Sequence, residues 1–240
     1  MVFREKARHL PLYIPEGSAP YFPDPRRERG FDGLIAVGGD LSPQRLLHAY
    51  ACGIFPWYAE GTDILWWSPN PRALIEMDQV HCSRSLERRL KRGDFQFTFD
   101  HAFVEVMMGC ADRDEGTWIL PEMADAYLKL FELGHAHSVE AWHEGALVGG
   151  LYGVQVGGLF AAESMFHRAT DASKAVLVVA VNSLARAGIR LFDVQFKTSH
   201  LASMGATEIP RDVYLARLAQ AVPCSAKLAN LELVTSRLTD

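Results

Sequence analysis

The sequence predicts an α+β protein, with a small N-terminal domain at residues 1–70 and a larger C-terminal domain at residues 71–240. Three observations lead to this prediction. Three apolar segments separated by short turns indicate an antiparallel meander. A long apolar helix and a further strand follow them, and a tract rich in tryptophan and proline closes the N-terminal part. The chain of 240 residues is long enough for both domains.

The N-terminal part contains one predicted helix behind an irregular arm. Residues 1–32 carry several prolines and charges and little periodicity, so we interpret them as an arm without regular structure. Ser42 is a suitable N-cap, Pro43 suits the first helical position, and Gly53 lies just past the helix end. The segment DILWWSPNPR is interpreted as a loop that holds the domain boundary.

The C-terminal part alternates helices and strands in a definite order. Helices are predicted over residues 83–92, over residues 121–133, from Asp171 to Ala187, and from Pro210 onward. The meander strands are HSVEAW, ALVGGLYGV and GLFAAESMF, with turns at Glu144-Gly145 and Gly157-Gly158, and residues 189–196 form the later strand. This order resembles that of acetyltransferase-like (GNAT-type) α+β domains.

Composition excludes several classes of protein. No apolar stretch is long enough to span a bilayer, the N-terminus lacks the apolar region of a secretory signal, and the four cysteines lie far apart. We therefore expect a cytoplasmic protein with reduced thiols. The histidines near residue 140 lack partners at ligand spacing, and no nucleotide-binding glycine motif occurs, so no metal and no cofactor are expected.

A basic cluster interrupts a chain whose formal net charge is −5. Arg84, Arg88, Lys91 and Arg92 share one face of the predicted helix at residues 83–92. This face either is simply solvated or binds the phosphates of an RNA.

Polar residues on two apolar strands are candidates for chemistry. On the strand IRLFDVQF, alternation predicts that Leu191, Asp193 and Gln195 share one face. The last two are either a structural pair or a carboxylate that orients a substrate-facing amide, because buried polar groups need partners. Glu163 in LFAAESMF either points to solvent or belongs to the same site.

Tryptophans in loops are a second group of candidates. Trp57 lies in an aromatic cluster between residues 50 and 67, and Trp118 lies in the segment EGTWI. Both are either core residues or platforms on which nucleotide bases stack.

The turn before the long helix argues against coenzyme A as the acyl donor. Acetyltransferases hold the pyrophosphate of coenzyme A with a glycine-rich turn, whereas here the segment is HRATDASKAV, without glycine. Backbone amides could not approach a pyrophosphate closely there. We therefore expect a different acyl donor.

Seven segments follow one another along residues 33–212: GGDLSPQRLLHAYACGIFPWY, ILWWSPNPRALI, EGTWI, ELGHAHSVEAW, LVGGLYGV, ESMFHRATDASK and DVQF with HLASMGA. In this order they resemble the leucyl/phenylalanyl-tRNA–protein transferase family. The resemblance implies transfer of Leu, Phe or, less well, Met from aminoacyl-tRNA to proteins that begin with Arg or Lys, which marks them for degradation. It also implies a GNAT-like C-terminal domain and no cofactor, and we expect a monomer.

The resemblance assigns roles to individual residues. It implies that Asp193, Gln195 and Glu163 are catalytic and that Trp57 and Trp118 stack on the terminal adenosine. An amide is a very poor base, so Gln195 either relays a proton toward Asp193 or accepts a hydrogen bond that orients the amine, and we favour the second role.

Further residues are expected at the substrate: Leu151 and Phe160 at the donor side chain, and Arg84, Arg88, Lys91 and Arg92 at tRNA phosphates.

Two rival hypotheses compete with this interpretation. One is an acetyltransferase-like enzyme that uses aminoacyl-tRNA or acyl-CoA on another amine, and the missing glycine turn argues against acyl-CoA. The other is a non-catalytic tRNA-binding module, and the presence of Asp193, Gln195 and Glu163 together argues against it.

Overall fold

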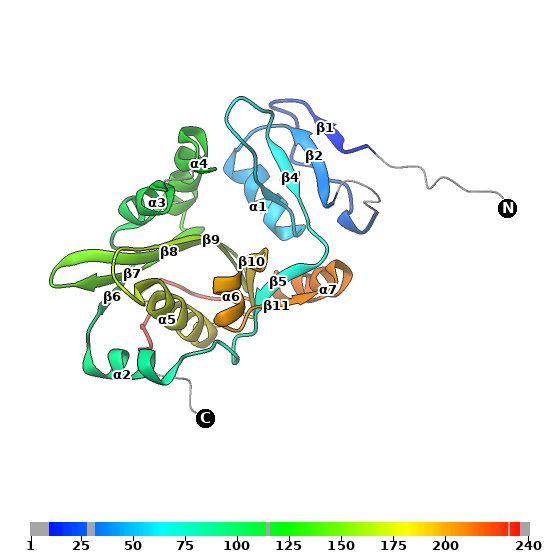
Figure 1. Cartoon of the computed structure of the whole chain (residues 1–240). Helices are drawn as coiled ribbons and strands as arrows, with labels where there is room; N and C mark the ends of the chain where they lie inside the picture. Colours follow the sequence, from blue (N-terminus) through cyan, green and yellow to red (C-terminus); the bar gives the residue numbers. More distant parts are fainter. Residues whose placement is uncertain (1–9, 28–31, 114–115, 230, 236–240) are drawn as a thin grey trace.

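The computed structural model describes residues 10–27, 32–113, 116–229 and 231–235, which are arranged around two β-sheets (Figure 1). The smaller sheet has the order β1–β2–β4–β3 and consists of β1 (Leu12–Ile14), β2 (Leu34–Gly38), β3 (Phe55–Pro56) and β4 (Leu65–Trp67). The larger has the order β11–β5–β10–β9–β8–β7–β6 and consists of β5 (Arg72–Ile75), β6 (Gln96–Phe99), β7 (Ala136–His143), β8 (Ala146–Val156), β9 (Leu159–His167), β10 (Leu191–Gln195) and β11 (Thr207–Ile209). The helices are η1 (Pro25–Arg27), α1 (Pro43–Ala51), α2 (Arg84–Arg92), α3 (Phe103–Ala111), α4 (Pro121–Glu132), α5 (Ala172–Arg186), α6 (Ser199–Ser203) and α7 (Arg211–Ala221).

The N-terminal part confirms the predicted helix and corrects the predicted loops. The Ser42 side chain accepts a hydrogen bond from the N–H of Arg45 and caps α1, as expected. The arm contains β1, which pairs in parallel with β2, and the segment predicted as a loop contains β4, which pairs with both β2 and β3. These three-residue strands are stabilised by pairing with distant residues, so no local pattern announces them. Residues 1–9 and 28–31 of the predicted arm lie outside the described residues.

The C-terminal part follows the predicted order. Strands β7, β8 and β9 form the antiparallel meander, and β10 lies parallel to β9 and antiparallel to β5. The turn between β8 and β9 requires a glycine at position 157, where φ is +58° and a Cβ would collide with the carbonyl oxygen of Val222. The α+β class and the meander–helix–strand order are therefore confirmed, whereas the boundary at residues 70 and 71 stays a prediction.

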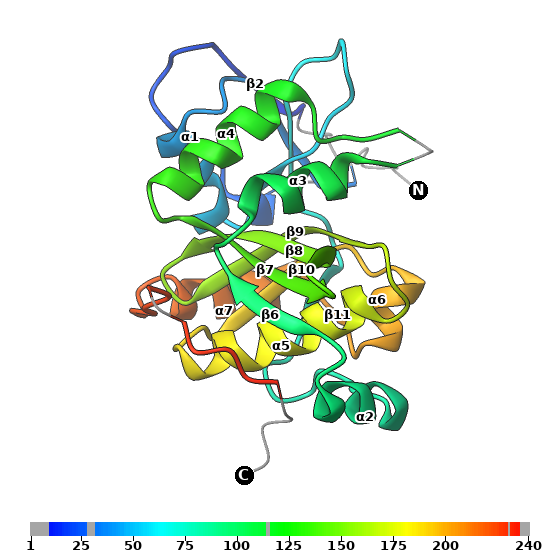
Figure 2. The ribbon, with the colours of Figure 1, turned by 90° about the vertical axis from the view of Figure 1, so that its left-hand side faces the viewer.

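Helices cover both faces of the larger sheet (Figure 2). In that view α3 and α4 lie above the sheet, and α5, with α2 beside it, lies below. One apolar core joins α1, α3, α4 and α7 to the upper face, and a second joins α2 and α5 to the lower face. Helix α5 is buried along most of its length, as its long apolar run predicts. Among the described residues, no helix is long and apolar enough to cross a membrane.

Candidate active site

A pocket of about 450 Å³ lies where β9 and β10 separate. The parallel pairing of these strands ends at Asp193 and Ala161, while β9 continues to His167. Side chains from both sheets line the space that opens there. The structure brings five of the predicted residues to this pocket: Trp57, Trp118, Leu151, Glu163 and Gln195.

Asp193 is fully buried and binds Arg72 beneath the pocket. Its Oδ1 accepts a hydrogen bond from Arg72 Nε at 2.8 Å, and its Oδ2 accepts from Arg72 Nη2 at 2.6 Å. Tyr214 on α7 donates a further bond to Oδ2 at 2.9 Å. The guanidinium of Arg72 is buried and lies over the rings of Phe55 and Tyr214. Its burial alone would lower its pKa, but the carboxylate of Asp193 outweighs this effect and raises the pKa. A carboxylate with this many hydrogen-bond donors is held in one position.

Gln195 departs from the alternation that the sequence predicts. A bulge lies between Asp193 and Gln195, and Gln195 has a φ of +57°. The positive φ is supported by a bond from the N–H of Gln195 to Asp193 Oδ1 at 3.0 Å. Of these two residues, Gln195 lines the pocket and Asp193 does not. The expectation that they share one face of a regular strand is therefore wrong.

The amide of Gln195 is anchored through its nitrogen. In the orientation that satisfies both ends of the amide, Nε2 donates to the carbonyl oxygens of Ala162 at 2.9 Å and Val194 at 3.0 Å. The first of these bonds joins β10 to β9 across the point where the strands separate. The amide oxygen Oε1 is then the group that Gln195 offers as a hydrogen-bond acceptor.

Glu163 lines the same pocket and is held by two tyrosines. Tyr50 of α1 donates to Oε1 and Tyr127 of α4 donates to Oε2, each at 2.8 Å, and the two hydroxyls lie 2.8 Å apart. Burial raises the pKa of Glu163 to about 7, and the two tyrosine bonds oppose this effect. The carboxyl group therefore changes charge near neutral pH.

Aromatic rings form one wall of the pocket. Trp57, which follows β3, is 45% exposed, and its ring lies 5.4 Å from that of Phe196, which follows β10. Phe196 also contacts Phe55 edge-on at 5.8 Å, so this wall joins the two sheets. Trp118 lines the pocket from the loop before α4 and is half-buried. Both predicted tryptophans thus present ring surface to the same space.

The two residues expected at the donor side chain are placed differently. Leu151 on β8 lines the pocket. Phe160 does not: the parallel register sets it beside Phe192, where their rings stack at 5.6 Å in the core that α5 covers. The expectation of direct contact with a ligand in this pocket is therefore not supported for Phe160, because its strand face turns toward α5.

The basic face of α2 is exposed, and none of its four cations lines the pocket. Leu86 and Leu90 are buried in the core, and the helix ends at Gly93. Two of the predicted cations have acidic neighbours: Lys91 pairs with Glu87 at 2.9 Å, and Arg92 pairs with Asp94 at 2.8 Å. Arg84 and Arg88 are exposed, and neither forms an ion pair with another described residue.

Several important residues escape the sequence patterns. Arg72 is the charged residue of an otherwise apolar strand, RALI, and this unusual position is a signal that could have identified it. Tyr50, Tyr127 and Tyr214 lie on amphipathic helices, where a tyrosine is an ordinary core residue. Their role depends on partners from distant parts of the chain.

The arrangement is suited to orienting two reactants. The pocket has mostly apolar and aromatic walls, in which an apolar side chain and a nucleobase can be buried and stacked. At its edge, Gln195 provides a fixed acceptor and Glu163 provides a carboxyl group that titrates near neutral pH. Such a site can hold an amine beside an activated acyl group.

Comparison with known proteins agrees with this geometry. The sequence pattern of the leucyl/phenylalanyl-tRNA protein transferase family matches residues 74–219, and the pattern of its N-terminal domain matches residues 39–70. A leucyl/phenylalanyl-tRNA–protein transferase of Anaeromyxobacter sp. (strain Fw109-5) is 56% identical over 205 residues, which cover 84% of this chain and 87% of the relative. One from Syntrophobacter fumaroxidans is 56% identical over 196 residues, which cover 80% of this chain and 84% of the relative. This chain belongs to the leucyl/phenylalanyl-tRNA–protein transferase family.

Proposed function

We propose that this enzyme transfers Leu or Phe, and less well Met, from aminoacyl-tRNA to the α-amine of cytoplasmic proteins that begin with Arg or Lys. The transfer would mark the acceptor proteins for degradation. The observation that carries the proposal is the joint presence of an anchored amide, a titrating carboxyl group and two tryptophans around one apolar pocket. The family membership supplies the substrate class.

The donor occupies the pocket through its last nucleotide and its amino acid. The terminal adenine stacks on Trp57 and Trp118, and each such contact contributes about 1–3 kcal/mol. The aminoacyl side chain lies against Leu151. An apolar pocket separates side chains by only about 1–3 kcal/mol per methylene group, which agrees with a site that accepts Leu, Phe and Met.

The acceptor amine is oriented by Gln195. An α-amine has a pKa of about 7.7–8.0, so much of it is neutral at physiological pH and needs no strong base. Its N–H donates to Gln195 Oε1, and the nitrogen lone pair attacks the ester carbonyl. Asp193 is a positioning residue, because it fixes the backbone of Gln195 through Oδ1 and does not line the pocket.

Glu163 stabilises the charge that develops during attack. The C–N bond forms first, so the nitrogen becomes positive while the carbonyl oxygen becomes negative. An ionised Glu163 in the pocket wall lowers the free energy of this positive charge. The ester C–O bond then breaks, and the 3′ oxygen of the tRNA leaves with a proton that the amine has lost.

The body of the tRNA is held outside the pocket. Arg84, Arg88, Lys91 and Arg92 on α2 contact its phosphates, which positions the RNA without reading its sequence. This arrangement suits an enzyme that accepts several tRNAs through their common 3′ end.

The direct test is transfer with purified components. The protein is mixed with tRNA charged with labelled Leu and with a peptide that begins with Arg, and the labelled product peptide is identified by mass spectrometry. An otherwise identical peptide with an acetylated N-terminus is the control. Failure to label the first peptide, or equal labelling of both, would contradict the proposal.

A further inference from the structure

A second cavity adjoins the pocket near the beginning of α5. Its volume is about 440 Å³, and the pocket and the cavity share three lining residues: Arg113, Met165 and His200. A ligand that fills the pocket can therefore continue into the cavity. The proposed catalytic residues Glu163 and Gln195 line only the first of the two spaces.

Basic side chains dominate the wall of this cavity. Arg113, Arg168, His167 and His200 line it, against the one acidic lining residue among the described part of the chain, Asp112. The pKa of His200 is lowered by its burial and then by the nearby Lys174 and His167. The Nε2 atom of His200 is buried without a hydrogen-bond partner among the described residues.

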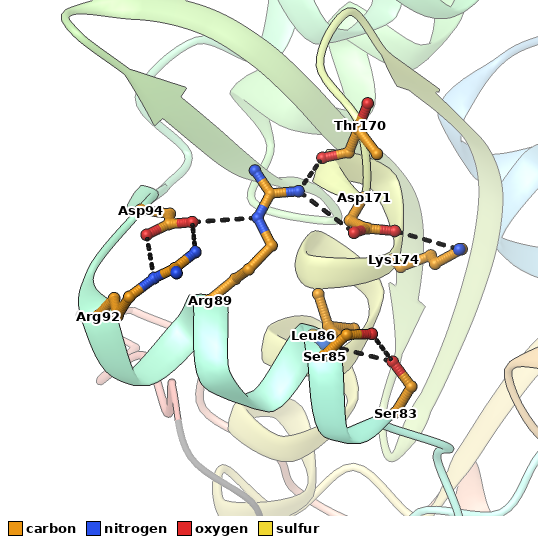
Figure 3. A network of polar contacts seen from close by, with 9 residues as sticks. All are labelled: Ser83, Ser85, Leu86, Arg89, Arg92, Asp94, Thr170, Asp171 and Lys174. Carbon is orange, nitrogen blue, oxygen red and sulfur yellow. Dashed lines mark hydrogen bonds and ion pairs between the residues drawn. The ribbon is translucent and has the colours of Figure 1, made fainter.

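The first turn of α5 adds one hydroxyl group without a hydrogen-bond partner among the described residues. Asp171 precedes the helix but does not cap it, because Lys174 and Arg89 bind its carboxylate at 3.1 and 3.2 Å (Figure 3). Ser173 is only 5% exposed and lines the cavity, and its hydroxyl forms no hydrogen bond with any residue that the structure describes. A helix N-terminus with a free hydroxyl and surrounding cations has the chemistry of an anion site.

We propose that this cavity binds the phosphate that joins the terminal adenosine of the tRNA to the preceding nucleotide. The inference rests on the proposed function, which places that adenosine in the adjoining pocket. Arg168 and the Ser173 hydroxyl bind the phosphate oxygens. The cavity also lies on the route to the basic face of α2, because Arg89 of α2 donates to the carbonyl oxygen of Thr170 at 2.6 Å. The RNA strand thus runs from the pocket, past the start of α5, to α2.

A single phosphodiester fits this cavity better than a pyrophosphate does. The backbone N–H groups of Arg168 and Ala172 in the turn already donate to the carbonyl oxygens of Val148 and Ala169. These amides cannot wrap a second phosphate group. The cavity therefore offers side chains and the first helical turn, which are enough for one charged group.

The test compares three Leu donors: the ester of adenosine, the ester of the dinucleotide cytidylyl-(3′→5′)-adenosine, and Leu-tRNA. For the unaltered enzyme we expect the dinucleotide donor to have a KM about tenfold lower than the adenosine donor, equivalent to ~1.4 kcal/mol of binding. In Arg168→Ala and in Ser173→Ala this advantage shrinks to about twofold or less, because charge-assisted bonds to the phosphate are lost. The KM of the adenosine donor stays the same in both variants.

The matched control is Arg186→Ala, which removes an exposed arginine from the opposite end of α5 and should leave all three KM values unchanged. Arg88→Ala should raise the KM of Leu-tRNA alone. The proposal is overturned if the dinucleotide has no advantage in the unaltered enzyme, or if Arg168→Ala and Ser173→Ala both retain it. It is also overturned if coenzyme A inhibits transfer from the adenosine donor and Arg168→Ala relieves that inhibition. Absence of transfer from every donor would instead refute the proposed function.

Discussion

Replacing Asp193 by asparagine tests whether the buried ion pair supports both the fold and the position of Gln195. The carboxylate of Asp193 accepts bonds from Arg72, Tyr214 and the N–H of Gln195. An amide has one accepting oxygen, so its NH₂ group must face some of these donors, and the Arg72 charge loses its partner. Breaking a buried pair in this way costs about 3–5 kcal/mol. For a chain of this size, each kcal/mol shifts Tm by roughly 2–4 °C, so Asp193→Asn should melt roughly 6–20 °C lower.

A second variant separates stability from activity. In the double variant Arg72→Met with Asp193→Leu, an apolar pair of similar volume replaces the ion pair, and such replacements are often neutral or stabilising. Calorimetry should therefore show that Tm recovers in part, because the Tyr214 hydroxyl and the N–H of Gln195 still lack their acceptor. Transfer should remain low at temperatures where the protein is folded, because the N–H of Gln195 has still lost Asp193 Oδ1. Full transfer activity in the double variant would refute the positioning role, and an unchanged Tm in Asp193→Asn would refute the energetic argument.

Further predictions concern the pocket and the tRNA contacts. Gln195→Ala should lower kcat by about a hundredfold, because the amine is no longer oriented, while the affinity for a non-reactive aminoacyl-adenosine analogue, measured by calorimetry, is unchanged. Because burial raises the pKa of Glu163 to about 7, the carboxylate forms as pH rises through that value, and kcat/KM should rise there. A pH profile of Glu163→Gln should lack this step and retain only the titration of the amine near ~7.7–8.0. Leu151→Ala should change the ratio of Leu to Phe transfer roughly tenfold in competition assays, and an unchanged ratio would remove this residue from the donor pocket. Arg88→Ala with Arg92→Ala should reduce the salt dependence of log affinity for tRNA by about 0.7–0.9 per lost phosphate contact. An equal loss of affinity for the adenosine donor would contradict the electrostatic role.

Patterns set by neighbouring residues made much of the fold predictable. Ser42 marks the start of α1, because its side chain accepts a hydrogen bond from the first turn of the helix. The apolar runs of the meander and of α5 predict strands and a helix that are buried in the core. The short strands β1 and β4 could not be predicted in this way, because each is held mainly by pairing with another segment.

The candidate site was predictable only in part for a related reason. Polar residues on apolar strands made Asp193, Gln195 and Glu163 candidates for the site, but they did not indicate the residues that hold them. Arg72 lies 121 positions from Asp193, and Tyr50 lies 113 positions from Glu163, so no local spacing connects either pair. The positive φ of Gln195 likewise depends on the folded partner and breaks an alternation that the sequence favours.

The site is divided between two parts of the chain that build separate sheets. Arg72 donates to the carbonyl oxygen of Gly53 at 3.2 Å, and Tyr50 of α1 donates to Glu163, so residues from the N-terminal part contact both of these charged side chains. A protein assembled from residues 1–70 and 71–240 as two separate chains would consequently lack a complete centre in either fragment. Transfer would return only on their association.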